Sequence, residues 1–470
     1  MGELRTARQR QADLEMNGDP MNDISQNSAT LDLLNDLIGR ARRAGADAAD
    51  AVLFEGISLS HGRRLGKTEK LERSEGHDLG LRVFIGRQQA IVSSSDRSPK
   101  ALGELVERAV AMAKTVPEDP YCGIADPGEV ARDWPALDMF DPEEPSAELL
   151  IERARAAEEA ALSVAGVTNS EGAEAGWGRS EIALVASNGF AGTYRGSSHG
   201  VSASVIGGTG TGMERDYDYS SAVYAADLRD PAEIGKSAGE RAVKRLGARK
   251  MPTCHCPVVF DPRVARGFIS HLLGAISGPS IARGTSFLKD RLGDQIFPEA
   301  ITIIDEPHRR RGLRSKPFDG EGIANHRRAI VDKGVLTTWL LDLRSARQLG
   351  LKTTGHAARG TSSPPGPSAT NVWIEPGVMS PQALIADIES GFYVTEMMGM
   401  GVNGVTGDYS RGAAGFWIDK GEIAFPVSEM TVAGNLKDMF ARLIAADDLE
   451  FKAGMDAPTL RVDDLTVAGA

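Results

Sequence analysis

The sequence predicts an α+β fold, in which an N-terminal α/β part with hairpins and helices precedes a β-dominated C-terminal domain with few helices. Helical periodicity and hairpin signals alternate over the first half, and short strand-like runs between turn residues fill the second half. Glycine accounts for 53 of the 470 residues, which favours turns and close backbone approaches. The predicted division is a flexible N-terminal extension (1–27), an N-terminal α+β domain (28–116), a linker (117–145), a central α+β segment (146–250) and a C-terminal β-rich domain (251–470).

The N-terminal domain is predicted to contain a helix, a hairpin and a second helix. Apolar residues at helical spacing predict the first helix over residues 29–44. Strict alternation of apolar and polar residues predicts a hairpin over residues 79–93, with its turn at Gly86. The second helix is predicted over residues 98–115, because Ser98 can cap it and a proline follows at the first helical position.

The central segment follows a proline-rich stretch without periodicity, residues 117–145, which is typical of a linker. A helix is predicted over residues 147–164. A hairpin is predicted over residues 181–206, with Asn188 and the glycine after it at the turn. The next helix is predicted over residues 230–246, since it opens with an aspartate, a proline and an early acidic residue.

The C-terminal domain is predicted to begin with a strand at residues 257–260 and a helix at 262–276. Short strands are then expected at 300–304, 334–340 and 413–418, each bounded by turn clusters. This region is therefore β-dominated.

Charge and composition exclude several classes of protein. The chain has 53 basic and 65 acidic side chains, a net charge of −12, which argues against direct nucleic-acid binding. Three scattered cysteines (Cys122, Cys254 and Cys256) form no disulfide framework, so a reducing compartment is expected. No apolar run approaches the length of a membrane span, and no signal peptide is evident. We therefore expect a cytoplasmic protein with no membrane or nucleic-acid partner.

Two glycine motifs match functional signatures but lack the structural context that the signatures require. Residues 196–200 match G-x-S-x-G around Ser198, yet the residues that follow alternate like a strand and do not start a helix. Residues 399–404 match G-x-G-x-x-G, but the next residues are poor helix formers. We expect neither a nucleophile elbow nor a dinucleotide site.

Candidate metal ligands are sparse. Cys254 and Cys256 can point the same way on an extended segment, but two thiols fall short of the four ligands that zinc prefers. Asp319 and Glu321 lie in a glycine-rich turn, where carboxylates more often accept turn hydrogen bonds. His271 shares the apolar stripe of the predicted helix 262–276, where a lone histidine is more often a packing residue. No H-E-x-x-H or H-E-x-x-x-H occurs in the sequence.

Several longer stretches resemble the TldD/PmbA family, also called the modulator of DNA gyrase family. The resemblance covers nearly the whole chain from about Leu31 and is densest in the C-terminal domain. The run V-T-G-D-Y-S-R-G-A-A-G-F-W is long and is similar to the PmbA, or TldE, branch. The stretches that carry the resemblance are 268–278, 283–288, 315–322, 354–356, 370–371 and 405–417.

The resemblance implies a subunit of a heterodimeric cytoplasmic metalloprotease that processes unfolded peptides. In that family, the TldD-type chain carries H-E-x-x-x-H and binds zinc. The matching positions here are Ile269, Ser270 and Gly274. The resemblance thus implies no zinc ligand and no catalytic base in this chain, no cofactor of its own, and zinc in a TldD-type partner.

The same resemblance suggests where a peptide or a partner subunit is contacted. The candidates are Asp408, Tyr409, Ser410, Arg411, the loop glycines Gly399, Gly401 and Gly404, and His271. Glycine-rich loops allow close backbone approach. An equally weighted alternative is that Asp408 and Arg411 form an internal pair that stabilises a turn.

Two other functions remain open from the sequence. One is a stand-alone, homodimeric peptide-binding or regulatory protein without hydrolytic activity. The other is an independent hydrolase that uses Cys254 and Cys256, or Ser198. A TldD-like chain in the same genome, and co-purification with it, distinguishes the subunit from the stand-alone protein. Activity or bound zinc in this chain alone would indicate the hydrolase.

Overall fold

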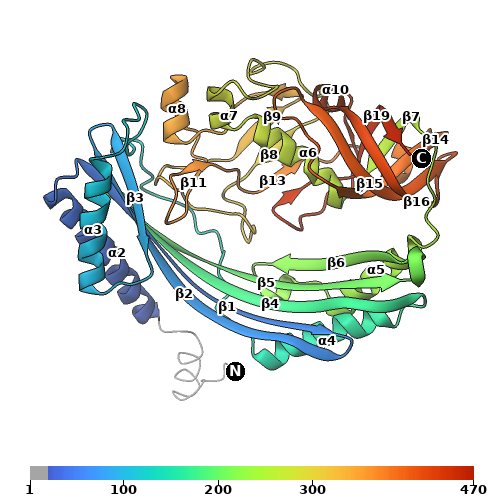
Figure 1. The fold of residues 1–470 in the computed structure, drawn as a ribbon, viewed down its shortest axis with the longest axis horizontal. Helices are drawn as coiled ribbons and strands as arrows, with labels where there is room; N and C mark the ends of the chain where they lie inside the picture. The colour runs from blue at the N-terminus through green and yellow to red at the C-terminus, as the bar shows by residue number, and fades with distance from the viewer. Residues whose placement is uncertain (1–19, 470) are drawn as a thin grey trace, which may run out of the picture.

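The computed structural model describes residues 20–469, and the α+β class is confirmed (Figure 1). The first helix, α2 (Pro20–Arg43), begins earlier than predicted, so residues 20–27 of the expected extension are helical. The rest of that extension, residues 1–19, lies outside the described residues. No helix within residues 20–469 is both long and apolar enough to cross a bilayer.

One long antiparallel sheet contains every strand of the first half. Its strand order is β3-β2-β1-β4-β5-β6, so the segments predicted as separate N-terminal and central units share a sheet through β1 and β4. Gly62 and Arg63 mark a bulge between β1 and β2. The strands are β1 (Ala48–Arg64), β2 (Lys67–Ile85), β3 (Gln88–Ser94), β4 (Val167–Ala186), β5 (Ala191–Gly207) and β6 (Glu214–Ala222).

Four helices cover the convex face of this sheet, because side chains alternate along the strands and the odd-numbered apolar residues of β1, β2, β4 and β5 point to that face (Figure 1). Helices α2 and α3 pack at one end, over residues such as Ala51 and Leu81. Helices α4 and α5 pack at the other end, over residues such as Ala173 and its partner in the register, Ala203. The last three of these helices are α3 (Pro99–Ala113), α4 (Ala147–Leu162) and α5 (Pro231–Lys244).

The C-terminal domain lies over the concave face of the long sheet (Figure 1). It contains a six-stranded sheet of order β16-β15-β14-β7-β19-β17 and a five-stranded sheet of order β10-β9-β8-β13-β18. The longer strands are β7 (Cys254–Phe260), β14 (Ser390–Met398), β15 (Asp408–Asp419), β16 (Glu422–Asn435) and β19 (Leu460–Ala468). The shorter ones are β8 (Ile303–Asp305), β9 (Arg328–Asp332), β10 (Val335–Leu336), β11 (Ala357–Ala358), β12 (Gly366–Pro367), β13 (Val372–Ile374), β17 (Ile444–Ala445) and β18 (Met455–Asp456).

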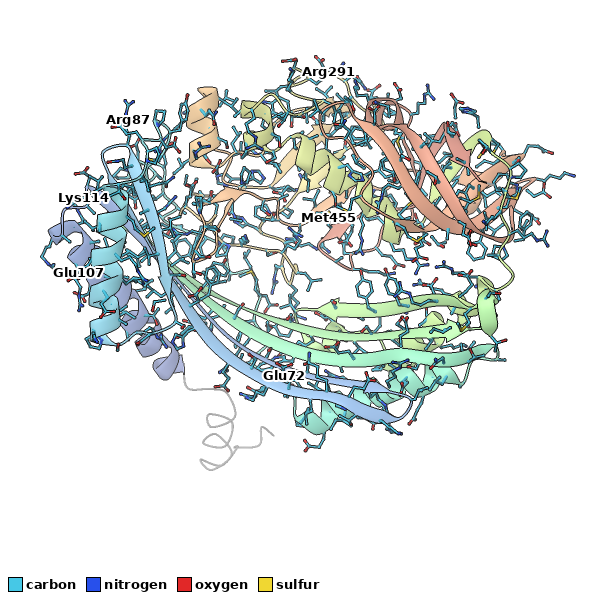
Figure 2. All side chains as sticks on the ribbon, in the orientation of Figure 1. Glu72, Arg87, Glu107, Lys114, Arg291 and Met455 are labelled. Atoms are coloured by element: carbon cyan, nitrogen blue, oxygen red, sulfur yellow. The ribbon has the colours of Figure 1, made fainter. Side chains whose placement is uncertain are left out.

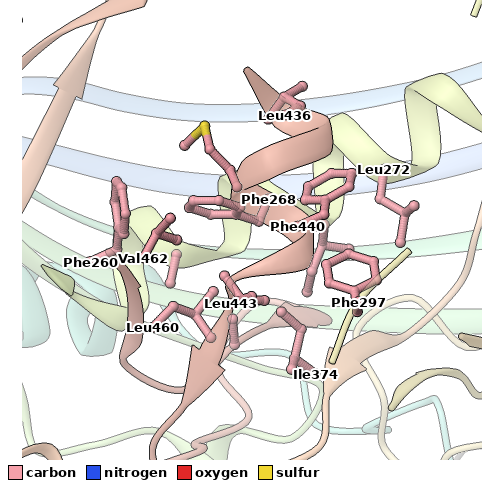
Figure 3. Close-up of a cluster of buried hydrophobic side chains, with 14 of the residues drawn as sticks. Phe260, Phe268, Leu272, Phe297, Ile374, Leu436, Phe440, Leu443, Leu460 and Val462 are labelled. Atoms are coloured by element: carbon pink, nitrogen blue, oxygen red, sulfur yellow. The ribbon is translucent and has the colours of Figure 1, made fainter. Parts of the chain in front are cut away.

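The core of this domain forms around helix α6 (Pro262–Ala275) and helix α10 (Leu436–Ala441). Phe268 and Leu272 of α6 point into it, and Phe297 stacks on Phe440 with ring centroids 4.6 Å apart (Figure 3). The remaining helices are short: α7 (Gly278–Ala282), α8 (Leu343–Leu349) and α9 (Pro381–Ile385). The predicted β-dominated domain with few helices is therefore confirmed.

Two predicted strands are wrong in extent. Strand β8 starts only at Ile303, because the chain turns before it, with the Ile301 amide donating to the Pro298 carbonyl. Strand β10 ends at Leu336, and the chain then runs to the end of α6, where the Leu340 carbonyl accepts from the Gly278 amide. A local turn in the first place, and a hydrogen bond to a distant segment in the second, replace the sheet pairing.

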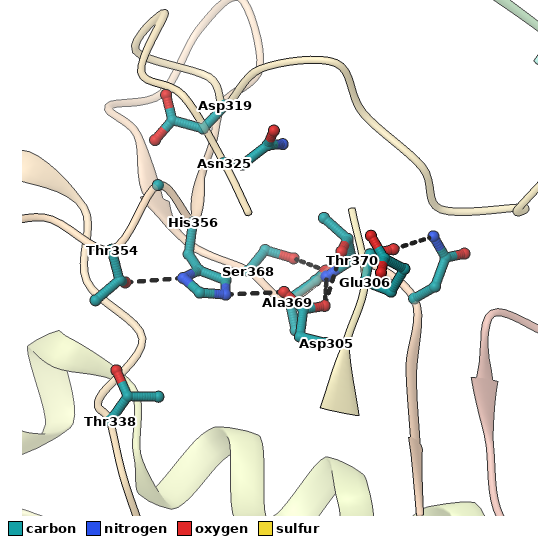
Figure 4. Close-up of polar contacts among 12 residues, drawn as sticks. Asp305, Glu306, Asp319, Asn325, Thr338, Thr354, His356, Ser368, Ala369 and Thr370 are labelled. Carbon is teal, nitrogen blue, oxygen red and sulfur yellow. Dashed lines mark hydrogen bonds and ion pairs between the residues drawn. The ribbon is translucent and has the colours of Figure 1, made fainter. Parts of the chain in front are cut away.

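A polar network connects the long sheet to the C-terminal domain. Asp50 of β1 accepts from Arg82 of β2 (2.5 Å) and from Arg359 of the C-terminal domain (2.5 Å), and all three side chains are buried. Further inside, His356 lies between Thr354 and Asp305, at 2.8 and 2.9 Å (Figure 4). These contacts hold the loops that face the sheet.

Candidate functional site

A cavity of about 620 Å³ lies between the long sheet and helix α6. Its walls come from β6, the exposed face of α6, β14, the start of β15 and the loop before β18. Met455 lies on the side of the C-terminal domain that faces the sheet (Figure 2). The cavity therefore brings together residues from both halves of the chain.

Helix α6 supplies the wall that the family resemblance singled out. Asp261 caps the helix by accepting from the Arg263 amide at 3.1 Å, and Pro262 follows at the first helical position. The apolar stripe with Phe268 faces the core, so the opposite side, including Ser270, is left at the cavity. A short helix thus presents polar side chains to the cavity while its other face is anchored.

The three positions that match the zinc motif do not fit a zinc ion. Ile269 is fully buried in the core, Ser270 lies at the cavity with its Oγ 3.2 Å from the Met455 sulfur, and Gly274 has no side chain. None of these offers an imidazole or a carboxylate. Within residues 28–469, no three His, Cys, Asp or Glu side chains converge to hold a metal ion. No chemical step is therefore assigned to a metal bound here.

His271, Tyr409 and Arg411 lie together beside this cavity. The rings of His271 and Tyr409 meet edge to face, with centroids 5.8 Å apart. Burial, with a smaller contribution from Arg411, lowers the pKa of His271 to about 4. Burial raises the pKa of Tyr409 to about 12, although Arg411 opposes the shift. At neutral pH both rings are therefore uncharged, and Arg411 carries the charge of the cluster.

The glycine-rich loop positions Arg411. Arg411 donates from Nε to the Gly399 carbonyl at 2.9 Å, and the Ser410 amide donates to the Gly401 carbonyl at 2.7 Å. A Cβ at Gly401 would overlap the Ser410 carbonyl, so this close approach requires glycine. The Gly404 carbonyl accepts from the Phe287 amide at 3.0 Å. The loop folds back on the start of β15 and holds Arg411 at the cavity.

Asp408 has a different environment and does not pair with Arg411. Its carboxylate accepts from Thr406 Oγ1 at 2.6 Å and from Asn435 Nδ2 at 3.0 Å. These hydrogen bonds hold the pKa of Asp408 below its usual range. Asp408 therefore stabilises the loop, whereas Arg411 lines the cavity. The loop tip also exposes Met400 and Val405 to solvent.

Arginines dominate the charge of the cavity. Arg263 makes two hydrogen bonds to Asp216, at 2.5 and 3.1 Å, and Arg245 pairs with Glu396 at 2.5 Å. Arg266 donates to the Tyr219 hydroxyl, and neither it nor Arg411 has a carboxylate partner within residues 28–469. The cavity thus retains positive charge in an acidic chain.

Sequence reasoning missed these arginines. Arg263 and Arg266 occupy the first turns of α6, where charged residues are typical of any solvated helix face. The sequence feature that could have identified them is the clustering of arginines opposite the apolar stripe of one helix. Their convergence with Arg215 and Arg245 depends on the placement of α6 opposite β6 across the cavity, which the sequence pattern does not contain.

The other candidate chemistries are not assembled. Ser198 and His199 are neighbours on β5, so they point to opposite faces of the sheet, and His199 lies 3.2 Å from Asp141 on the convex-face side. Burial, together with Cys254, raises the pKa of Cys256, so its thiol stays protonated at neutral pH. Asp319 accepts hydrogen bonds from the amides of residues 321 and 323, as expected for a turn.

Comparison with known proteins places matches along most of the chain. Three family models match: PmbA/TldA metallopeptidase domain 1 over residues 49–113, the central domain over residues 140–246 and the C-terminal domain over residues 253–469. Together they cover the long sheet, its central helices and the C-terminal domain.

Similar whole proteins and structures give the same result. "Metalloprotease PmbA" of Escherichia coli O157:H7 is 38% identical over 95% of this chain and 98% of its own length. A PmbA homologue from Haemophilus influenzae is 37% identical over 91% of this chain and 94% of its own. A crystal structure of a proposed modulator of DNA gyrase from Bacteroides thetaiotaomicron superposes with a TM-score of 0.86 at 28% identity, over 93% of this chain and 98% of that one. TldE from Thermococcus kodakarensis shares the fold, with a TM-score of 0.83 at 20% identity over 93% and 100%.

Proposed function

Because the chain belongs to the PmbA/TldD metallopeptidase family, we propose that it is the metal-free subunit of a two-chain cytoplasmic metallopeptidase that processes unfolded peptides. A TldD-type partner would hold the zinc ion and hydrolyse the peptide bond. This chain would bind and orient the peptide.

The proposal rests mainly on which residues stand at the three α6 positions that match the zinc motif. Ile269 is part of the hydrophobic core, and Ser270 and Gly274 offer no side chain suited to zinc or to general-base work. Around them the cavity keeps polar and charged groups, including Arg266 and Arg411. A cavity that offers polar groups but no zinc ligands suits a subunit that holds the peptide while the partner chain hydrolyses it.

The proposed role follows from the positioning of substrate. Holding an unfolded peptide against a second subunit lowers the entropy that must be lost in the reaction. The cavity lies between two parts of the chain, so it admits an extended peptide but is too small for a folded protein. The loop with Met400 and Val405 at its tip is the surface that we assign to the partner, because both side chains are exposed and apolar.

The test is to purify this chain alone, a TldD-type chain alone and the two together. We expect zinc by elemental analysis only in preparations that contain the TldD-type chain, and cleavage of unfolded casein only in the mixture. Arg411→Ala is expected to reduce cleavage, and Arg87→Ala, on the distant β2–β3 turn (Figure 2), serves as its control.

Two results would contradict the proposal. Stoichiometric zinc or cleavage in this chain alone would indicate an independent hydrolase. Peptide binding with no association to a TldD-type chain would instead support the stand-alone homodimeric binding protein.

A further inference from the structure

A second cavity, of about 730 Å³, lies between the concave face of the long sheet and the segment 312–316 of the C-terminal domain. Residues 368–369 complete that side. Arg314 lines both this cavity and the one beside α6, so the two are neighbours. The residues that line this second cavity have no role in the α6 site described above, apart from Arg314.

The floor of the second cavity contains eight adjoining positions, on four adjacent strands, that carry only glycine or serine. Register places them in two neighbouring rows across β2, β1, β4 and β5. All eight share one face of the sheet, because successive rows are two residues apart. The first row is Gly76, Gly56, Ser180 and Gly196, and the second row is Ser74, Ser58, Gly178 and Ser198.

This glycine–serine floor leaves room and hydrogen-bonding capacity for a ligand. Glycine adds no side chain, and strand interiors disfavour it because it weakens them and packs nothing. Small residues alone do not identify a ligand, but the opposite wall adds charge. The floor has four serines, Ser58, Ser74, Ser180 and Ser198, and none of their hydroxyls makes a hydrogen bond to another group among residues 28–469.

The opposite wall carries two neighbouring cations without a carboxylate partner. Arg314 donates from Nη2 to the Ala369 carbonyl at 3.3 Å and makes no ion pair within residues 28–469. The Lys316 ammonium makes neither a hydrogen bond nor an ion pair with those residues. Burial lowers the pKa of Lys316, Arg314 adds to the shift, and Asp319 and Asp305 oppose it.

The nearest carboxylates are already engaged elsewhere. Asp305 accepts from His356 at 2.9 Å and from Thr370 at 2.7 Å. Asp319 accepts from three backbone amides, those of residues 321, 323 and 357. Arg314 and Lys316 therefore line the cavity without an ion pair to any of residues 28–469, although the chain has a net charge of −12.

The segment that carries these cations is held in a defined conformation. The Arg314 amide donates to Asn371 Oδ1 at 3.1 Å, and the Lys316 amide donates to the Pro307 carbonyl at 3.0 Å. Asn325 donates to the Lys316 carbonyl at 3.0 Å. A preorganised pair of cations binds an anion at a lower entropic cost than mobile surface side chains do.

We propose that Arg314 and Lys316 form a carboxylate-binding site for an extended peptide whose main chain lies on the glycine–serine floor. The carboxylate comes from the peptide C-terminus or from an acidic side chain. Arginine binds a carboxylate through two parallel hydrogen bonds, and lysine adds a point charge. The serine hydroxyls donate to and accept from the peptide main chain. This inference rests on the proposed function, because it names the class of peptide that the chain handles.

The experiment measures peptide binding by fluorescence anisotropy with the full chain alone and with a TldD-type partner. The probes are a fluorescein-labelled unfolded peptide with a free C-terminus, its C-terminal amide, and a version in which every Glu is replaced by Gln. We expect removal of the responsible carboxylate to weaken binding about tenfold or more, as for the loss of a charge-assisted hydrogen bond. The amide identifies a terminal carboxylate, and the Gln peptide identifies an acidic side chain.

Variants locate the effect in this cavity. Arg314→Gln with Lys316→Gln should abolish the preference for the carboxylate, and Lys316→Arg should retain it. Arg87→Gln is the matched control, because Arg87 is exposed on the turn at the far end of the sheet. Gly76→Val should weaken binding of all three peptides. A Cβ at Gly76 meets no atom within 4 Å, so this variant is expected to fold.

Three outcomes would overturn the inference. The first is equal affinity for all three peptides. The second is an unchanged preference for the carboxylate in the Arg314/Lys316 double variant. The third is that inorganic phosphate, at constant ionic strength, displaces all three peptides equally. Cleavage by the mixture without any carboxylate preference would overturn this inference and leave the proposed function intact. Failure of the mixture to cleave, with the carboxylate preference retained, would contradict the proposed function alone.

Discussion

The core of the C-terminal domain and the contact between that domain and the long sheet are built in opposite ways. Phe268, Phe297 and Phe440 pack in an apolar core (Figure 3), whereas Asp50 joins the two parts through buried charges. Apolar packing tolerates small changes of shape, but a buried charge that loses its partner is strongly destabilising. The relative placement of the two parts, and with it both cavities, therefore depends on a few polar contacts.

Removal of Asp50 should have the largest effect. Asp50→Ala leaves Arg82 and Arg359 buried without their shared carboxylate, and we expect a loss of about 3–5 kcal/mol in the free energy of unfolding. Urea denaturation measures it. Asp36→Ala is the control, because Asp36 pairs with Arg40 at the surface and should cost at most about 1 kcal/mol. Equal effects of the two variants would show that the buried charges at the contact matter no more than a surface ion pair does.

The second effect is a dependence of stability on pH. Burial raises the pKa of Glu321 from 4.5 to about 8; Arg82 opposes the shift, and Asp319 adds to it. Because the folded-state pKa lies above the unfolded value, this group stabilises the fold most below its unfolded pKa. That stabilisation is lost as pH rises through the folded-state pKa. Thermal melts between these two values should show stability falling with pH, and Glu321→Gln should flatten the curve. An unchanged slope in the variant would assign the dependence to other groups.

A conservative change in the apolar core should cost less. Ile269→Val removes one methyl group from a fully buried side chain of α6 and should lower the free energy of unfolding by about 0.5–1.5 kcal/mol. Peptide binding should not change, because Ile269 faces away from the cavity. A loss of binding in a folded variant would show that the core and the cavity are coupled.

The smallest change in stability is expected at Gly274, and it is favourable. Gly274 lies inside α6 and a Cβ there meets no atom within 4 Å, so Gly274→Ala should stabilise the protein by about 0.5–1 kcal/mol through chain entropy. The same melts that test Ile269→Val measure it. Destabilisation would indicate that position 274 contacts a group that lies more than 4 Å away in this structure.

The charge on Arg411 can also be tested without an activity assay, through the pKa of His271. Arg411 contributes to the low pKa of His271, after burial, so Arg411→Met should raise the His271 pKa from about 4 while leaving it below the usual value. NMR titration of the His271 ring measures the shift. A pKa that does not move would place Arg411 farther from the ring than the structure does.

The sequence alone predicted most helices, because their signals are local. Ser98 and Asp230 cap α3 and α5 at the predicted positions, and α6 begins at the predicted residue, Pro262. The apolar stripe of α6 is visible as a periodicity, and it indicated which side of the helix is buried. The family resemblance rests on contiguous motifs, and the family matches agree with it.

The tertiary structure alone decided the long strands and the cavities. The middle of β1, β2, β4 and β5 contains many glycine, serine and charged residues, which have low strand propensity, and pairing with neighbouring strands keeps them extended. Arg314, Lys316 and the glycine–serine rows are far apart in sequence and meet only when the C-terminal domain lies over the sheet. The sequence by itself determined where the longer helices form and to which family the chain is similar. Long-range strand pairing and the packing of two distant segments determined the cavities, because no local pattern specifies which residues face one another across a domain contact.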